Sequence, residues 1–263
     1  MRAYCYFIKI RILESLAYQY EFFFTVGKQF LFILLTALFW KALYRSNPTA
    51  GGVSVNDMLI YSVISVFLQN FYVKGVEGNL RRRIRDGNIA VDYLKPVNLF
   101  AMFFAQDVGS IAVNLLQRFL PALLFACLFV VVPQPASWVA LGLFVVSAVM
   151  GFVILWCIAG LFGLLYFWLT DTGNLGGIKD YIVGILSGAV IPIWFFPPAA
   201  QTVLTYLPFT YTYQLPISIF IGKLTPQQAL PAMGIQLVWC GVFFALFAAV
   251  SKRATRNILV QGG

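Results

Sequence analysis

The strongest constraint in the sequence is a run of 52 residues without a charged side chain, between Arg118 and Asp171. Soluble domains have about 25% charged residues, whereas here 10% of the residues are charged and 61% are hydrophobic. This is too little polar material to cover a water-soluble globule. The sequence therefore indicates an integral membrane protein and excludes a soluble enzyme, a disulfide scaffold and a disordered chain. Because barrel strands alternate apolar and polar residues, the long apolar run favours helices.

The apolar residues fall into six stretches that can span a membrane. A crossing helix needs about 20 mainly apolar residues to traverse about 30 Å of hydrocarbon. We therefore predict an all-α polytopic membrane protein whose single transmembrane domain covers residues 21–263. The six predicted spans are residues 22–43, 57–75, 104–132, 138–169, 178–196 and 228–251.

Lysine and arginine residues gather on one side of these spans. Thirteen of the eighteen lie before the first span, between spans two and three, between spans four and five, or after the sixth. Three lie on the opposite side, and two lie inside spans. Because cytoplasmic loops are enriched in basic residues, this asymmetry predicts that both termini are cytoplasmic.

The first twenty residues carry an apolar stripe at helical spacing. The stripe consists of Ala3, Tyr6, Ile10, Leu13, Ala17 and Tyr20. Intervals of three and four residues are typical of one face of a helix, so residues 1–20 are expected to form an amphipathic helix at the cytoplasmic interface. Such a helix either anchors the chain only or also docks a cytoplasmic partner, and the pattern fits both.

Signatures of catalysis and metal binding are missing from the sequence. It has no histidine, and its four cysteines are scattered, so neither an imidazole nor a thiolate metal site is expected. Gly27-Lys28-Gln29 and Gly222-Lys223-Leu224 lack the hydroxyl residue and the upstream glycine of a phosphate-binding loop. We expect the chain to bind no cofactor, no metal and no nucleic acid, and to have no enzymatic activity by itself.

The most distinctive polar segment is RRRIRDGNIAVDYLKP, residues 81–96, in a cytoplasmic loop expected over residues 76–100. Arg81 to Arg85 predict a short helical turn, which Gly87-Asn88 can end with a left-handed residue. One interpretation is an orientation signal that contacts anionic lipids. The other is a short cytoplasmic helix that inserts into a partner protein. Composition alone leaves both open.

Two basic residues lie inside predicted spans, where an ionised side chain costs about 2.5–3.5 kcal/mol at the bilayer centre on insertion scales. Lys28 is seven residues beyond Glu21 and can extend its amine back to the cytoplasmic interface. Arg118 lies deeper, next to Gln117 and four residues after Asn114. We expect Arg118 to face other helices or a water-filled cavity, where it is a candidate for an anionic substrate path.

Seven of the twelve prolines fall within residues 192–231. Proline prevents this apolar segment from forming one continuous helix, so we expect an outer re-entrant helical hairpin over residues 197–227, between spans five and six. Irregular backbone at membrane depth is tolerated only when it is packed in protein or lines a cavity. The aromatic residues here fit an interfacial belt or an exit gate for an amphipathic substrate. The gate candidates are Trp194, Phe195, Phe196 and Phe209.

The order of these features resembles the type-2 permeases of ATP-binding-cassette (ABC) exporters. The matching patterns are DGNIAVDYLKPVN at 86–98, AVIPIWFFP at 189–197, LPF at 207–209 and the basic terminal segment that ends in Gly262-Gly263. They are similar to the bacterial branch of compact six-span permeases, and the resemblance covers essentially the whole chain.

The resemblance implies a half-transporter of the bacterial cytoplasmic (inner) membrane. Such permeases pair with an identical or a related permease and bind two separate nucleotide-binding ATPase subunits, which hold ATP and Mg²⁺. Spans one, two and five of each protomer would enclose the path, and the N-terminal helix would be a second contact with the ATPase. The residues implied in coupling to the ATPase are Arg81, Arg82, Arg83, Arg85, Asp86 and Gly87.

The expected function is thus ATP-driven export of an amphipathic or hydrophobic substrate by alternating access. The alternative is an ATP-independent channel or secondary transporter. That alternative needs ionisable groups within the membrane, and the sequence offers Lys28, Arg118 and Asp107. A non-transporting assembly subunit is a third interpretation.

Overall fold

Every regular element in the described part of the chain is a helix. The computed structural model describes residues 2–17, 19–45, 50–93, 97–169 and 174–261. The longer helices are α1 (Arg2–Ala17), α2 (Gln19–Leu43), α3 (Val55–Phe71), α4 (Gly75–Arg85), α6 (Leu99–Asn114), α7 (Leu120–Phe129), α8 (Trp138–Leu165), α9 (Leu175–Leu186) and α12 (Pro226–Gln261). The short elements are α5 (Ile89–Tyr93), α10 (Pro198–Thr205), α11 (Gln214–Phe220), the 3-10 turns η1 (Ala50–Gly52) and η3 (Ile193–Phe195), and the π-helix η2 (Leu115–Phe119).

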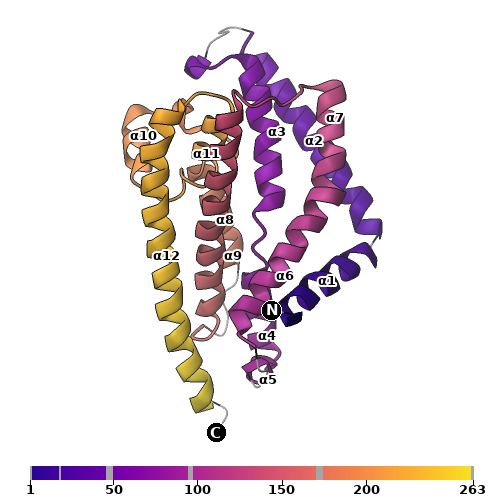
Figure 1. Cartoon of the computed structure of the whole chain (residues 1–263), viewed down its shortest axis with the longest axis vertical. Helices are drawn as coiled ribbons and strands as arrows, with labels where there is room; N and C mark the ends of the chain where they lie inside the picture. Colours follow the sequence, from indigo (N-terminus) through magenta and orange to yellow (C-terminus); the bar gives the residue numbers. More distant parts are fainter. Residues whose placement is uncertain (1, 18, 46–49, 94–96, 170–173, 262–263) are drawn as a thin grey trace.

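Figure 1 shows these helices as an elongated bundle with α12 along one side and α2 along the other. We call the end that carries α4 and α5 the α4 end, and the end that carries α10 the α10 end. The last turns of α12 lie at the α4 end, and α1 lies toward it. The central helix is α8, which packs against α4, α11 and α12.

Five helical stretches among the described residues are long and apolar enough to cross a membrane. They are Phe23–Leu43, Val55–Arg85, Leu99–Phe129, Trp138–Leu165 and Pro226–Ala254. These stretches overlap the predicted spans one to four and six. The prediction of an all-helical, polytopic membrane protein is thereby confirmed.

The predicted fifth span over residues 178–196 is not a continuous helix. The α-helix in this region is α9, with 12 residues, and its length of about 18 Å at 1.5 Å per residue is too short to cross a bilayer. The helix ends before Gly188, which has a φ of 81°, and Pro192 follows shortly after. Between Leu165 and Pro226 the chain nonetheless passes from the α4 end to the α10 end (Figure 1), through α9 and irregular backbone.

The segment predicted as a hairpin, residues 197–227, contains two short helices, α10 and α11. They are joined by turns around residues 206–213. Of the two, α11 is the more deeply packed, because it contacts α3, α8 and α12. Six consecutive residues of α11, from Leu215 to Phe220, are buried.

Polar side chains begin three of the long helices. Ser54, Asn98 and Ser137 are the N-caps of α3, α6 and α8, and their side-chain oxygens accept hydrogen bonds from the amides three residues later. These bonds satisfy amides that have no partner within the helix. The prolines of Pro133-Gln134-Pro135 separate α7 from α8, as the sequence predicts.

The N-terminal helix α1 packs against α6, and Phe7 joins the main hydrophobic core. Tyr6 and Leu13, which are seven residues apart in the predicted stripe, are exposed. The side chains of three other stripe residues, Ala3, Ala17 and Tyr20, lie outside the described ones.

The irregular backbone that follows α9 receives hydrogen bonds from side chains of α3. The Tyr61 hydroxyl donates to the Gly188 carbonyl at 2.6 Å. One turn further along α3, the Ser65 hydroxyl donates to the Ala189 carbonyl, also at 2.6 Å. These carbonyls have no helical partner, so the hydroxyls supply donors that hydrocarbon cannot provide.

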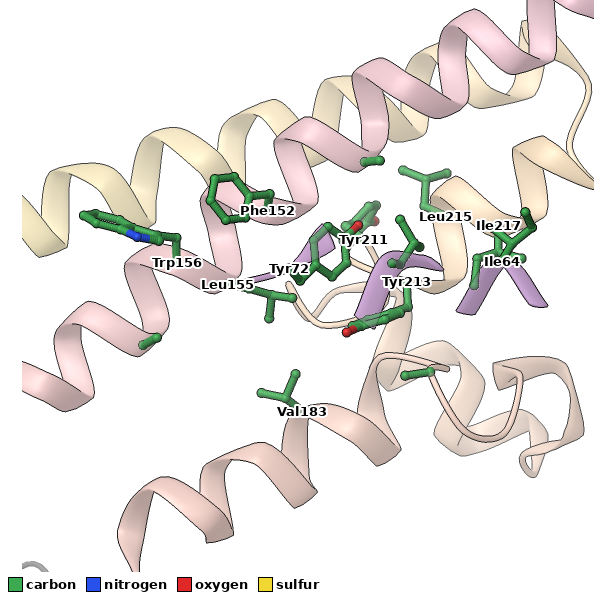
Figure 2. Close-up of a cluster of buried hydrophobic side chains, with 14 of the residues drawn as sticks. Ile64, Tyr72, Phe152, Leu155, Trp156, Val183, Tyr211, Tyr213, Leu215 and Ile217 are labelled. Atoms are coloured by element: carbon green, nitrogen blue, oxygen red, sulfur yellow. The ribbon is translucent and has the colours of Figure 1, made fainter. Parts of the chain in front are cut away.

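Backbone carbonyls in the turn before α11 also accept hydrogen bonds from distant side chains. The hydroxyl of Tyr72, at the end of α3, donates to the Thr212 carbonyl at 2.5 Å, and Figure 2 shows the Tyr72 ring between α8 and the turn. On α12, fully buried Gln236 donates through Nε2 to the carbonyls of Tyr211 at 2.7 Å and Ser147 at 2.8 Å. Residues far apart in the sequence thus hold this non-helical segment in place.

Replacing Gln236 with leucine is expected to destabilise the fold. The Gln236→Leu change removes the donor for the buried Tyr211 carbonyl and the acceptor for the buried Ser147 hydroxyl, and each buried group left unsatisfied costs about 1–3 kcal/mol. Unfolding of the purified protein in detergent, followed by circular dichroism, should show a lower free energy of unfolding. Gln227→Leu, at an exposed position of the same helix, is the matched control and should change stability by less than about 0.5 kcal/mol. Equal stability of the two variants would contradict this role of Gln236.

Candidate functional site

The predicted basic segment forms the second half of α4. The helix ends as the sequence predicts, because Gly87 has a φ of 71° and donates its amide to the Ile84 carbonyl at 3.1 Å. A left-handed glycine after the last turn is a common helix C-terminus. Asp86 is the C-cap, and both Asp86 and Gly87 are exposed.

The two faces of α4 differ sharply. Val76 and Leu80 are fully buried, and the helix packs against α6 and α8. On the opposite side Gly78, Arg81, Arg82 and Arg85 are exposed. We call these four residues the arginine face. It presents three guanidinium groups on a helix whose other side is fixed in the bundle.

Arg83 is also a residue of α4, but its side chain makes contacts within the protein. Its Nη1 atom forms an ion pair with Oδ2 of Asp92 on α5, and Asp92 is only 2% exposed. The Arg83 guanidinium also lies 5.5 Å from the centre of the Phe103 ring. Arg83 therefore connects α5 to α4 and α6, although the sequence groups it with its three exposed neighbours.

Asp107 fixes the start of α4, and sequence analysis identified it only as an ionisable group within a span. Its Oδ2 atom accepts hydrogen bonds from the Val76 amide at 3.2 Å and from Nε1 of Trp156 at 2.9 Å. A carboxylate at a helix N-terminus is favourable because the amides there carry partial positive charge. Asp107 of α6 thus joins α4 to α8. The available signal was an acidic residue in an apolar span, which requires partners.

A buried ion pair connects α4 to α9. Nζ of Lys179 pairs with Oε2 of Glu77, and the Lys179 side chain is 4% exposed. Lys74, just before α4, pairs with Asp180 at 2.6 Å. Breaking a buried pair leaves an uncompensated charge, so these contacts constrain the position of α9 relative to α4.

Two of the four gate candidates come together near the α10 end. The Trp194 ring lies edge-on to Tyr61 of α3, with centroids 5.4 Å apart, and Phe195 stacks on Trp40 of α2 at 5.3 Å. Nζ of Lys223 lies 4.4 Å from the Trp194 ring centre, and burial lowers the pKa of this amine. We call Trp194, Phe195, Tyr61 and Trp40 the aromatic cluster.

The other two gate candidates occupy different positions. Phe209 packs with Ile154 and Cys240, between α8 and α12. Phe196 ends η3, and its carbonyl accepts a hydrogen bond from Nε2 of Gln201 at 2.7 Å. The four aromatic residues thus differ in their contacts, although Trp194, Phe195 and Phe209 all pack against the main hydrophobic core.

Arg118 lies within the π-helix η2, which packs against α2 and α3. Here the Leu120 amide donates to the Leu115 carbonyl, five residues back. Pro121 explains the change, because proline has no amide to donate to Gln117 and its ring clashes with that carbonyl in a regular α-helix. Arg118 is partly buried, and its orientation toward other helices or a water-filled cavity stays a prediction.

Comparison with known families identifies the group to which this fold belongs. The ABC-2 family transporter proteins match over residues 30–257, from α2 to near the end of α12. The chain belongs to this family. No curated protein sequence matches the chain.

Membership makes the chain a membrane-spanning permease subunit of an ABC transporter. It also implies association with ABC ATPase subunits. Such a permease is a transport component, and in this family it is generally not catalytic itself. The described residues contain no group of three or more side chains suited to a metal ion.

A methyl group at Gly75 is expected to displace α4. A Cβ atom there would overlap Oδ1 of Asp107, whereas a Cβ atom at Gly78, on the exposed side of α4, would meet nothing within 4 Å. Gly75→Ala should weaken the Asp107 cap by about 1–2 kcal/mol and speed hydrogen exchange of the α4 amides about tenfold. Gly78→Ala should slow this exchange slightly, because alanine favours helix.

Hydrogen–deuterium exchange of peptides that cover residues 75–85, measured on the purified permease in detergent, tests this expectation. If the two alanine variants exchange at the same rate, Asp107 does not fix the start of α4.

Proposed function

We propose that this permease is half of an ATP-driven exporter that moves an amphipathic or hydrophobic substrate by alternating access. It pairs with an identical or a related permease and with two separate ATPase subunits. ATP and Mg²⁺ bind to those subunits, and this chain binds no cofactor and has no enzymatic activity of its own. Residues 21–263 form the permease domain, and residues 1–20 add a helix at the cytoplasmic interface.

The arginine face carries this proposal. Arg81, Arg82 and Arg85 are exposed, while the rest of α4 is fixed by Asp107 and by the Glu77–Lys179 pair. A helix with these properties can receive a displacement from a bound protein and pass it to α6, α8 and α9. A helix that only contacts anionic lipid would not need these buried contacts with the rest of the bundle. We infer that α4, with Asp86 and Gly87 at its end, is the coupling helix that inserts into the ATPase.

The course of the chain supports six crossings with both termini in the cytoplasm. Five helical stretches can cross, and the broken path from α9 to the α10 end adds a sixth passage. The helices α10 and α11 then form the re-entrant hairpin on the outer side. The excess of basic residues at the α4 end supports a cytoplasmic location for that end, in a bacterial inner membrane.

The proposed translocation path is enclosed by α2, α3 and the broken fifth passage of each permease. Trp194 and Phe195 contact α3 and α2, so the aromatic cluster is positioned as an outer gate between these elements. Arg118 lines the same path deeper in the membrane. Phe196, which directly follows Phe195, and Phe209, which packs between α8 and α12, remain further candidates for this gate.

Charge reversal on the arginine face is expected to disrupt the complex with the ATPase. In Arg82→Glu/Arg85→Glu, two attractive contacts with the partner become repulsive, and like-charge contacts at an interface cost several kcal/mol. ATPase recovered with the tagged permease, and ATPase stimulation by it, should fall at least about tenfold. Lys41→Glu/Arg45→Glu, a matched double variant of exposed residues near the α10 end, should leave both unchanged.

Normal ATPase stimulation by the Arg82→Glu/Arg85→Glu variant would contradict the coupling role of α4. Arg83→Glu is a separate control, because it breaks the contact with Asp92 and should lower stability as well as assembly. Transport by the purified chain alone, driven by an ion gradient in liposomes, would instead support the channel or secondary-transporter alternative.

A further inference from the structure

Arg118 is a charged side chain deep in a membrane-spanning stretch. It lies 11 residues from Phe129 and 19 from Leu99, the ends of this stretch, which are about 16 Å and 28 Å of helix. No hydrogen bond or ion pair to its guanidinium occurs among the described residues. A charge at this depth is normally paired or functional.

Three amide side chains from three helices lie beside this position. Nε2 of Gln29 on α2 donates to Oδ1 of Asn70 on α3 at 2.9 Å, and Nδ2 of Asn114 on α6 donates to the Asn70 carbonyl at 3.4 Å. Asn114 is one turn before Arg118. We call Gln29, Asn70 and Asn114 the amide cluster. Because Oε1 of Gln29 is buried without a hydrogen-bond partner, the cluster is itself incompletely satisfied.

Aromatic rings pack between α2, α3 and the stretch that carries Arg118. Phe30 of α2 stacks on Phe125 of α7, with centroids 4.6 Å apart. Phe67 of α3 lies edge-on to Phe119, the neighbour of Arg118, at 4.9 Å. Phe30, Phe119 and Phe125 pack with a small core shared by α2, α3 and α7. On the outside of the same stretch Leu120 and Leu124 are exposed, so an alkyl chain attached to a group at Arg118 finds an apolar surface there.

The acidic side chains of α6 and α3 are engaged elsewhere. Asp107 of α6 is bonded to α4 and α8, 11 residues before Arg118. Asp57, at the start of α3, accepts a hydrogen bond from Ser54 at 2.7 Å. The natural complement of an arginine with adjacent amides is an acidic group, since guanidinium binds carboxylate and phosphate with two parallel hydrogen bonds.

We propose that Arg118 binds the acidic headgroup of an amphiphile, with the amide cluster beside it and the alkyl chain against the apolar surface of the neighbouring helices. The π-helix η2, which carries Arg118, packs against α2 and α3. This assignment rests on the proposed transport function, because it makes the amphiphile the transported substrate. A resident lipid with the same headgroup chemistry is the competing occupant.

The test uses four probes and the purified permease in phosphatidylcholine nanodiscs. Dodecyl phosphate, dodecylphosphocholine and dodecyltrimethylammonium share one tail and differ in charge, and inorganic phosphate has no tail. Dodecyl phosphate should bind most tightly. Its dissociation constant should rise about tenfold to a hundredfold in Arg118→Gln and stay unchanged in Lys41→Gln, a matched loss of charge elsewhere. Arg118→Lys, which keeps the charge but loses the planar fork, should give an intermediate value and serves if the glutamine variant does not fold.

Three binding results would overturn the site. They are equal affinity for the cationic probe, equal affinity for inorganic phosphate, and unchanged affinity in Arg118→Gln or Arg118→Lys. A second measurement identifies the occupant: dodecyl phosphate should raise the ATPase rate of the assembled complex, and Arg118→Gln should abolish the increase. Selective binding without this increase would identify a resident lipid and overturn the substrate assignment. Failure of any ATPase to assemble would overturn the proposed function, while the binding measurements would still decide the site.

Discussion

The hydrogen bonds from α3 to the broken segment after α9 are the interaction on which the rest of the bundle depends. Hydrocarbon offers no partner for a peptide carbonyl, so a chain that interrupts a crossing helix must bring its own donors. Here Tyr61, Ser65 and Tyr72 provide them, and Gln236 of α12 adds one to the Tyr211 carbonyl. The same bonds place Trp194 and Phe195 against α2 and α3. The aromatic cluster is therefore a consequence of how the break is satisfied.

At the α4 end, buried charged side chains connect the helices, as the hydrogen bonds from α3 do at the broken segment. Asp107, Lys179 and Asp92 are all at least 95% buried, and each pairs with a group on or beside α4. These contacts leave only the arginine face free for a partner. A protein that binds this face therefore acts on a helix already connected to α5, α6, α8 and α9. Coupling between an external ATPase and the membrane helices then needs no flexible intermediate.

Much of the fold could be predicted from the sequence, because continuous apolar length is a strong signal. It was possible to predict five of the spans, the turn at Pro133-Gln134-Pro135 and the end of α4 at Gly87. The break of the fifth span could be predicted only in part. The prolines indicated an interruption, but α9 ends earlier, before Gly188. Pairings such as Asp107 with Val76 or Arg83 with Asp92 could not be predicted, because they depend on which helices meet.

The contacts of α4 also have a consequence for the order in which the protein is made. Residues 75–85 are synthesised before Asp107 and long before Lys179, so neither partner exists when α4 leaves the ribosome. An 11-residue helix with four arginines is too short to be stable alone in water. The arginine face is thus complete only after α6, α8 and α9 have been inserted. With the coupling role proposed for α4, this order disfavours capture of an ATPase by a permease that is not yet complete.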